Sequence, residues 1–183
     1  TVNSASMSAD KMEELLFGSE TFDNIQIGLL EQANGGILFF DEVADMPIGT
    51  QSKILRVLVD QQFIRIGGKT KISFDIRVIS SSSRNLLIEI EKKNFREELY
   101  HRLNVIPISV PSLETRLDDI PLIANHFINE LNKTQGLPNR SLSDKAVAYL
   151  QTRDWPGNIR QLRNILERSL ILGSQSGDIS PTE

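Results

Sequence analysis

The sequence contains no cysteine and two histidines, His101 and His126. The lack of cysteine excludes disulfides and thiolate metal sites, and two histidines so far apart argue against a histidine metal site. No apolar run approaches the length that a membrane span requires. No secretory signal opens the chain at Thr1. We therefore expect a cytoplasmic protein that is not inserted into a membrane.

Charge and composition exclude further classes. The net charge is −4, so the chain as a whole is not a polycation that would bind nucleic acid. Its 183 residues, 39% hydrophobic and 24% charged, are enough to bury a core. A soluble globular protein follows, and any DNA contact is expected to be local or to come from segments outside this chain.

Apolar patterning divides the chain into two parts. Up to residue 111, short apolar runs that fit buried strands, such as 37–40, alternate with helical spacing. From 112 to 172 only helical periodicity remains, interrupted by proline and glycine. The predicted fold class is therefore α/β with a parallel sheet over 1–111, followed by a small all-α subdomain over 112–172. Residues 173–183 are polar and are expected to begin a linker.

Several element boundaries follow from the same patterning. Helices are expected at 118–133, 143–152 and 158–172, where apolar residues recur with helical spacing. Residues 105–110 alternate apolar and polar side chains through Pro107, which is typical of an edge strand.

Two acidic residues, Asp41 and Glu42, directly follow the apolar run at 37–40. A buried strand delivers such side chains to the carboxyl edge of a parallel sheet, where ligands bind. The first carboxylate can hold Mg²⁺ through water, and the second can orient and deprotonate the water that attacks a nucleotide. A strand that simply ends in solvated acids explains these six residues equally well. They therefore do not by themselves distinguish a nucleotide site from an ordinary strand end.

Further motifs make the pattern specific. Residues 35–43 resemble the Walker B segment of the AAA+ transcription activators that act on the sigma-54 form of RNA polymerase. Other landmarks of that family follow in the family's order: QSKILRVL (51–58), RIGG (65–68), DIRVI (75–79), FREELYHRLNV (95–105), DDIP (118–121) and WPGNIR (155–160). The resemblance covers nearly the whole chain and is closest to nitrogen-linked two-component response regulators.

Arg96 and Arg102 flank a predicted apolar helix stripe at positions 95, 99 and 103. Guanidinium groups beside a packed face are well placed to meet a phosphate across an interface. By resemblance they are the paired arginine fingers, which act on the ATP of the adjacent subunit and stabilise transition-state charge. The alternative, which spacing alone favours, is a solvated helix with Glu97 and Glu98 as local partners.

The resemblance implies four more site residues. Arg160 resembles the sensor II arginine, which reaches nucleotide phosphates from the helical lid. Asn3 resembles the asparagine that holds the Walker B glutamate away from water. Ser82 and Ser83 occupy the sensor I position, where many relatives carry Thr-Asn; Ser82 keeps a hydroxyl, but the Ser83 side chain has no amide. A surface arginine and a polar residue at a chain end are the alternatives for Arg160 and Asn3.

Two motifs of the family are missing. Gly68-Lys69-Thr70 matches the end of a phosphate loop, but Phe63 stands where its first glycine should be, and the segment follows the acids. We interpret it as a turn and expect the true loop before Thr1, so the chain alone should bind ATP weakly or not at all. Residues 19–27 are shorter than the family's sigma-contacting loop and lack Gly-Ala-Phe-Thr-Gly-Ala.

These features predict the central AAA+ domain of a bacterial two-component transcriptional regulator. ATP and Mg²⁺ bound at subunit interfaces would control homo-oligomerisation, from dimer to ring, and transcription. DNA would be bound by a C-terminal domain outside this chain. The missing loop argues against a sigma-54 contact and leaves contact with RNA polymerase open. The alternative is an oligomerisation module that has lost hydrolysis; a clamp-loader-type machine is disfavoured by the motifs at 118–121 and 155–158.

Overall fold

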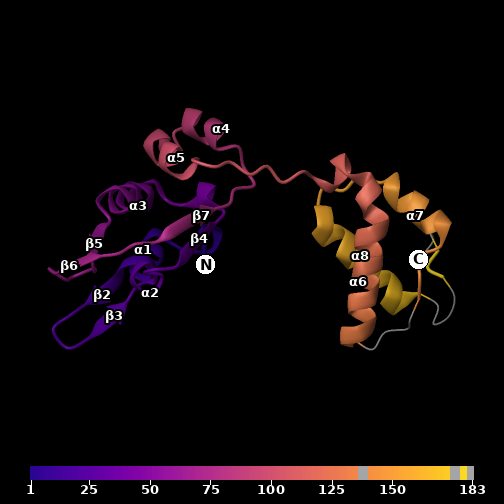
Figure 1. Ribbon diagram of the computed structural model, residues 1–183, viewed down its shortest axis with the longest axis horizontal. Helices are drawn as coiled ribbons and strands as arrows, with labels where there is room; N and C mark the ends of the chain where they lie inside the picture. The colour runs from indigo at the N-terminus through magenta and orange to yellow at the C-terminus, as the bar shows by residue number, and fades with distance from the viewer. Residues whose placement is uncertain (136–139, 174–177, 181–183) are drawn as a thin grey trace. The chain divides into compact units, whose positions relative to one another are not determined.

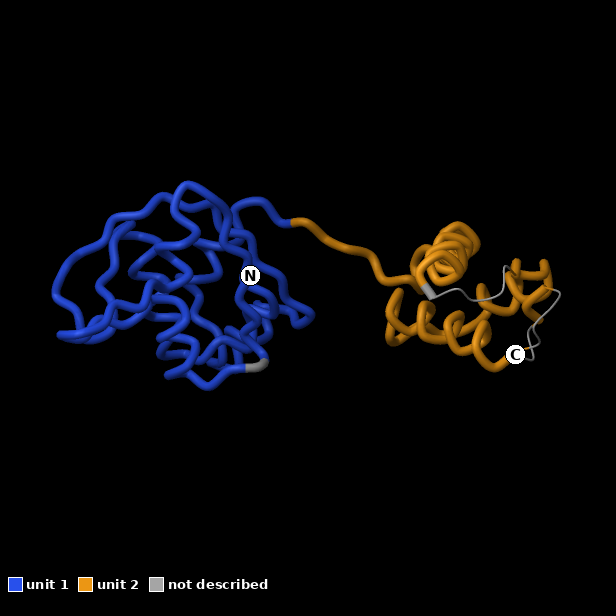
Figure 2. Tube along the Cα trace, turned by 90° about the horizontal axis from the view of Figure 1, so that it is seen from below, with its two compact units in different colours: residues 1–107 blue, residues 108–183 orange. Residues whose placement is uncertain are grey.

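The computed structural model describes residues 1–135, 140–173 and 178–180 (Figure 1). The chain divides into two compact units, Thr1–Pro107 and Ile108–Glu183 (Figure 2). None of the helices in the described ranges is both long and apolar enough to cross a membrane.

The first unit is built on a sheet of three parallel strands. These are β1 (Val2–Asn3), β4 (Ile37–Asp41) and β7 (Arg77–Ser80), in the order β1-β4-β7. The apolar run at 37–40 therefore forms the central strand, with Leu38 and Phe40 buried on it. This confirms the predicted α/β class with a parallel sheet. In this register, Asn3 lies opposite Asp41, so both sit at the carboxyl edge.

Five helices and two hairpins complete the first unit. The helices are α1 (Ala9–Phe17), α2 (Leu29–Gln32), α3 (Ile48–Asp60), α4 (Leu86–Glu91) and α5 (Glu97–Leu103). The hairpins are β2 (Gly18–Glu20) with β3 (Ile25–Ile27), and β5 (Gln62–Ile64) with β6 (Lys71–Ser73). Short 3₁₀ turns, η1 (Ser4–Ser6) and η2 (Val43–Asp45), follow β1 and β4.

One apolar core joins the sheet of the first unit to its helices. Helical spacing places Ile54, Val57 and Leu58 on one face of α3, and all three are buried. They belong to the same buried cluster as Phe40 of β4 and Leu99 of α5. The sheet edge that carries the acids therefore rests on packed, close-fitting side chains rather than on a mobile surface.

Arg65 joins the β2–β3 hairpin to the rest of the unit. Its guanidinium lies 2.9 Å from Glu20, the last residue of β2, and 2.9 Å from Glu31 of α2, and its side chain is 13% exposed. The hydrogen bond to Glu31, and next the one to Glu20, raise the pKa of Arg65 above its ordinary value. Backbone bonds from Glu20 N–H to Ile66 O and from Ile66 N–H to Gly18 O reinforce this connection.

The segment at 67–70 is a turn between two antiparallel strands, as predicted. β5 and β6 pair on either side of it, and Gly67 adopts a φ of 79°, which favours glycine. A phosphate loop leads from a strand into a helix whose N-terminus faces the phosphates. A hairpin turn has no such helix, so Gly68-Lys69-Thr70 is not a phosphate loop.

The second unit is helical. It contains η3 (Leu113–Thr115), η4 (Leu117–Asp119), α6 (Ile120–Gln135), α7 (Asp144–Gln151) and α8 (Asn158–Leu172). The three α-helices occur where apolar spacing predicted them. Trp155 is fully buried among their apolar side chains and donates its indole N–H to Leu150 O at 2.9 Å. Ile179, within the stretch expected as a linker, is 3% exposed and belongs to this core.

The expectation of an edge strand at 105–110 was wrong. No named strand covers these residues, and Val105, Ile106, Ile108 and Val110 are exposed. A strand forms only where a neighbour offers matching N–H and C=O groups. Within the described residues, the three-stranded sheet pairs β7 with β4 alone. Residues 105–110 therefore have the apolar–polar alternation of a strand, but no neighbouring strand of the described chain pairs with them.

Candidate functional site

The two predicted acids stand where the central strand ends. Asp41 is the last residue of β4, and Glu42 follows with φ 53° and ψ 56°, in the left-handed region. A residue other than glycine is uncommon there, and such strained residues cluster at functional sites. The conformation turns the chain from β4 into η2 and leaves both carboxylates half-buried at the sheet edge.

Ser81, the first residue after β7, holds Asp41. Its hydroxyl donates to Asp41 Oδ1 at 2.7 Å and accepts from the Glu42 N–H at 3.2 Å. Its backbone bonds to the same segment, with Ser81 N–H donating to Phe40 O and Val43 N–H donating to Ser81 O. The sequence did not single out Ser81. The signal available was its place one residue after a strand that neighbours β4 in the sheet.

Ser83 holds Glu42. Its backbone N–H and its hydroxyl both donate to Glu42 Oε2, each at 2.9 Å. Ser82 instead bonds locally, since its hydroxyl donates to Arg84 O and accepts from Arg84 N–H. Of the two serines predicted at the sensor I position, the structure thus brings Ser83 to the acids and uses Ser82 in a turn.

Asn3 lies beside the acids on the other neighbouring strand. It is the cross-strand partner of Asp41, and its Oδ1 accepts from Ala5 N–H at 3.0 Å, which caps η1. Its position is compatible with the predicted role toward Glu42, which stays a prediction.

The two predicted finger arginines lie at opposite ends of α5. Arg96 precedes the helix, and its backbone N–H donates to Gln51 Oε1 at 2.9 Å. Its Nε is buried and has no hydrogen-bond partner among the described residues. Arg102 donates from Nη2 to Leu58 O, at the end of α3, at 2.8 Å. No ion pair within the described ranges joins either arginine to Glu97 or Glu98.

Arg160 belongs to the second unit. It lies in the first turn of α8, on the exposed side of a helix whose Leu162 and Leu166 are buried. An exposed guanidinium is free of the core packing of its own unit and is accessible to an anion. Its predicted role as sensor II stays a prediction.

The acids suit a metal that is shared with a nucleotide. No group of three or more metal-ligating side chains occurs among residues 1–135, 140–173 and 178–180. Mg²⁺ in nucleotide sites does not need one, because it keeps several waters and uses one or two carboxylates plus phosphate oxygens. Asp41, whose Oδ1 bonds to Ser81, can offer its other oxygen in this way.

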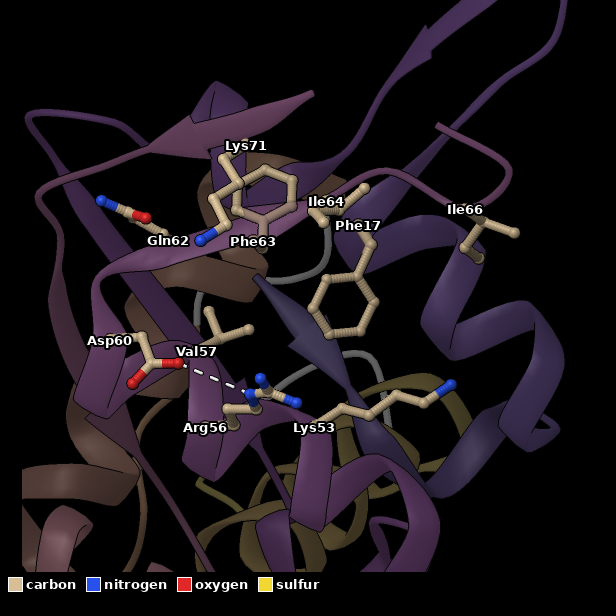
Figure 3. Close-up of a pocket in the computed structure, with 10 residues that line it drawn as sticks. All are labelled: Phe17, Lys53, Arg56, Val57, Asp60, Gln62, Phe63, Ile64, Ile66 and Lys71. Atoms are coloured by element: carbon tan, nitrogen blue, oxygen red, sulfur yellow. Dashed lines mark ion pairs between the residues drawn. The ribbon is translucent and has the colours of Figure 1, made fainter. Parts of the chain in front are cut away.

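A pocket of about 710 Å³ lies elsewhere in the first unit, between α3 and the β5–β6 hairpin (Figure 3). Phe17, Phe63 and Ile66 supply apolar walls, and Lys53 and Lys71 lie at its rim. None of the ten residues that line it is a predicted site residue. The pocket is therefore separate from the acids.

Comparison with known proteins identifies the family of the chain. Residues 1–109 match the Sigma-54 interaction domain, and residues 114–183 match the AAA+ ATPase lid domain. The chain is 48% identical over 183 residues to the nitrogen assimilation regulatory protein NtrX of Azorhizobium caulinodans, covering 99% of this chain and 40% of that protein. It is 40% identical over 179 residues to the DNA-binding transcriptional regulator NtrC of Azospirillum brasilense, covering 95% and 37%.

Solved structures give the same result. Crystal structures of NtrX from Brucella abortus, in complex with ADP and in complex with ATP, match with a TM-score of 0.92 and 46% identity. The match covers 99% of this chain and 42% of the crystallised one. The chain thus spans about two fifths of the length of these relatives.

Proposed function

We infer the function of this chain from its family, because it belongs to the sigma-54 interaction domain family of AAA+ ATPases and carries an AAA+ lid. It is homologous to the NtrX and NtrC regulators. We propose that it is the central domain of a bacterial two-component transcriptional regulator. In the longer protein, ATP bound at subunit interfaces would control assembly and transcription.

The observation that carries this proposal is the pair of acids held by the loop after β7. Glu42 would orient and deprotonate the attacking water, and the two donors of Ser83 would fix the direction of its carboxylate. Asp41, fixed by Ser81, would hold Mg²⁺ through water. The metal would neutralise phosphate charge when bound. Preorganised polar groups of this kind need little rearrangement as the reaction proceeds.

Residues from other parts of the assembly would complete the site. Arg96 and Arg102 would stabilise charge on the ATP of the neighbouring subunit. The bond from Arg102 to Leu58 O uses one of five guanidinium donors, so others remain for phosphate. Arg160 would reach the phosphates from the lid. Ser82, Ser83 and Asn3 would make the site sensitive to the nucleotide state.

The organisation we propose is an α/β subdomain over 1–111, a lid over 112–172 and a link to a DNA-binding domain that begins within 173–183, where Ile179 still packs in the core of the second unit. The protein would be cytoplasmic and would form homo-oligomers. A sigma-54 contact is not supported by the β2–β3 hairpin, since residues 21–24 alone join its strands and lack the family's contact motif. Phe22 at its tip is fully exposed. We therefore propose that the longer protein does not open promoters together with sigma-54 polymerase.

The test is phosphate release by the longer protein that contains this chain and its upstream sequence. Glu42→Gln should abolish release while ATP binding, followed with a fluorescent ATP analogue, persists. Asp23→Asn, an exposed acid on the hairpin, is the matched control and should leave release unchanged. Release that survives Glu42→Gln would contradict the proposal. ATP binding and assembly without any release would favour the oligomerisation module.

A further inference from the structure

Arg84 extends the loop that holds the acids. It directly follows the serines that bond Asp41 and Glu42, and its guanidinium pairs with Asp45 in η2, just beyond those acids. A second nitrogen of Arg84 lies 3.5 Å from Glu89 Oε2 on α4. Arg84 therefore connects the acid segment to a helix outside the sheet.

Glu89 is a buried carboxylate that the proposed reaction does not use. Its side chain is 6% exposed, and Asn94 Nδ2 donates to its Oε2 at 3.0 Å while Lys92 Nζ donates to its Oε1 at 3.3 Å. The bond from Asn94, supported by Lys92 and Arg84, holds the pKa of Glu89 below its usual value against the opposing effect of burial. Asn94 and Phe95 also donate their backbone N–H groups to Glu89 O.

Gln51 connects Asn94, the partner of Glu89, to Arg96. Its side chain is fully buried in α3 and donates to Asn94 O at 2.9 Å and to Met46 O at 2.7 Å. Its Oε1 accepts from Arg96 N–H at 2.9 Å. Two routes thus run from the segment after the acids to the start of α5. One passes through Arg84, Glu89 and Asn94, and the other passes directly from Met46 through Gln51.

We propose that Arg84 and Glu89 are positioning residues that tie the acids of a protomer's own ATP site to the Arg96 that it presents to its neighbour. The proposal rests on the proposed function, because it requires Arg96 to act across a subunit interface. Its physical basis is that the contacts from Glu89 through Asn94 and Gln51 to Arg96 are buried or half-buried, and each contact of the connection involves a charge or a main-chain group. Such networks have few alternative arrangements, so a displacement at one end is transmitted to the other.

The test uses mixed assemblies of the longer protein. One protomer carries Arg96→Ala and keeps its own acids; the other carries Glu42→Gln and keeps its finger. Alone each should be inactive, and together they should release phosphate at sites that combine the acids of the first with the Arg96 of the second. Arg84→Gln is then placed in the first protomer or in the second. Its side chain is 45% exposed, so the substitution should leave the fold intact.

We expect Arg84→Gln to lower the phosphate release of the mixture roughly tenfold in either placement, because misplacement of a catalytic group slows the reaction steeply. Glu89→Gln, which keeps an oxygen for Asn94, should do the same. Glu91→Gln removes the same charge from an exposed neighbour on α4 and should do nothing. An effect in one placement alone, or none beyond that of Glu91→Gln, would overturn the proposal. A mixture that is inactive without Arg84→Gln would instead contradict the proposed function.

Discussion

At the scale of single residues, the geometry of Glu42 depends on its neighbours as much as on its own side chain. Its backbone is left-handed, and its carboxylate accepts two hydrogen bonds at one oxygen. A free glutamate samples many rotamers, and fixing one of them costs conformational entropy. The two hydrogen bonds from Ser83 fix the rotamer of Glu42 when the protein folds. The carboxylate is therefore already oriented before the proposed substrate, ATP, binds.

Ser83→Ala should lower kcat for ATP hydrolysis by the longer protein, up to about tenfold, and leave KM nearly unchanged. The variant loses one hydrogen bond to Glu42 and keeps the one from the backbone, and such a bond contributes about 0.5–1.5 kcal/mol. Steady-state kinetics would measure it. Ser83→Thr keeps the hydroxyl and should restore the rate. Ser19→Ala is the matched control, because the Ser19 hydroxyl bonds to Gln26 within the β2–β3 hairpin; an equal loss in that variant would refute the role of Ser83.

The site residues differ in how far the sequence could predict them. The position of Asp41 and Glu42 at the end of a buried strand could be predicted because an apolar run fixes where such a strand ends; their roles stay predictions. Ser81 was missed because its role depends on β7 lying next to β4, and strand order is not encoded in local spacing. Gln51 was missed for a similar reason: its three partners lie before and after it in the chain and meet only in the folded unit.

At the scale of elements, the β2–β3 hairpin depends on a side chain far from it in sequence. Three residues per strand are too few for an isolated hairpin to be stable in water. Arg65 supplies the missing support by pairing with Glu20 of the hairpin and Glu31 of α2. The hairpin is therefore held to the packed unit through the last residue of β2, and Phe22 in the turn beyond it is fully exposed.

Arg65→Gln should loosen the hairpin without unfolding the first unit. The variant loses the ion pairs that connect Glu20 of β2 to Glu31 of α2, so amide hydrogen exchange across 18–27 should accelerate severalfold while exchange in β4 stays slow. Mass spectrometry of peptides from the exchanged protein would show it. Arg56→Gln breaks the exposed pair with Asp60, whose side chains are 85% and 52% exposed, and should leave the hairpin unchanged. Equal exchange in the two variants would contradict this account.

Element prediction succeeded for helices with a local apolar stripe and for the strand at 37–40, and it failed for the alternating segment at 105–110, which has no neighbouring strand among the described residues. The helix predicted at 158–172 begins and ends as expected, because its apolar stripe and its flanking turns are local properties. The strand predicted at 105–110 is absent, although its alternation is regular. Whether such a segment forms a strand is decided by pairing at long range, which a single segment cannot specify.

At the scale of the whole molecule, two separate cores account for the stability of the chain. The apolar cluster of the first unit lies within residues 2–99, and that of the second lies within 113–179. No residue belongs to both clusters. The sequence has a single tryptophan, Trp155, and it is buried in the second core. Its fluorescence therefore reports on the second unit.

We expect Leu162→Ala and Leu38→Ala to show that the two units have separate unfolding transitions in urea. Both leucines are buried, and each truncation should cost about 2–5 kcal/mol. Leu162→Ala should lower the midpoint that tryptophan fluorescence reports. Leu38→Ala should leave that midpoint in place and lower the one seen by circular dichroism for the sheet-containing unit. A fluorescence midpoint that moves equally in both variants would show that the units unfold as one.

The left-handed backbone of Glu42 has an evolutionary consequence. A side chain in this conformation costs roughly 1–2 kcal/mol, which glycine would avoid. Selection for folding alone would therefore drift toward glycine or asparagine at this position. If Glu42 has the role proposed for it, a glutamate in this conformation trades stability for chemistry.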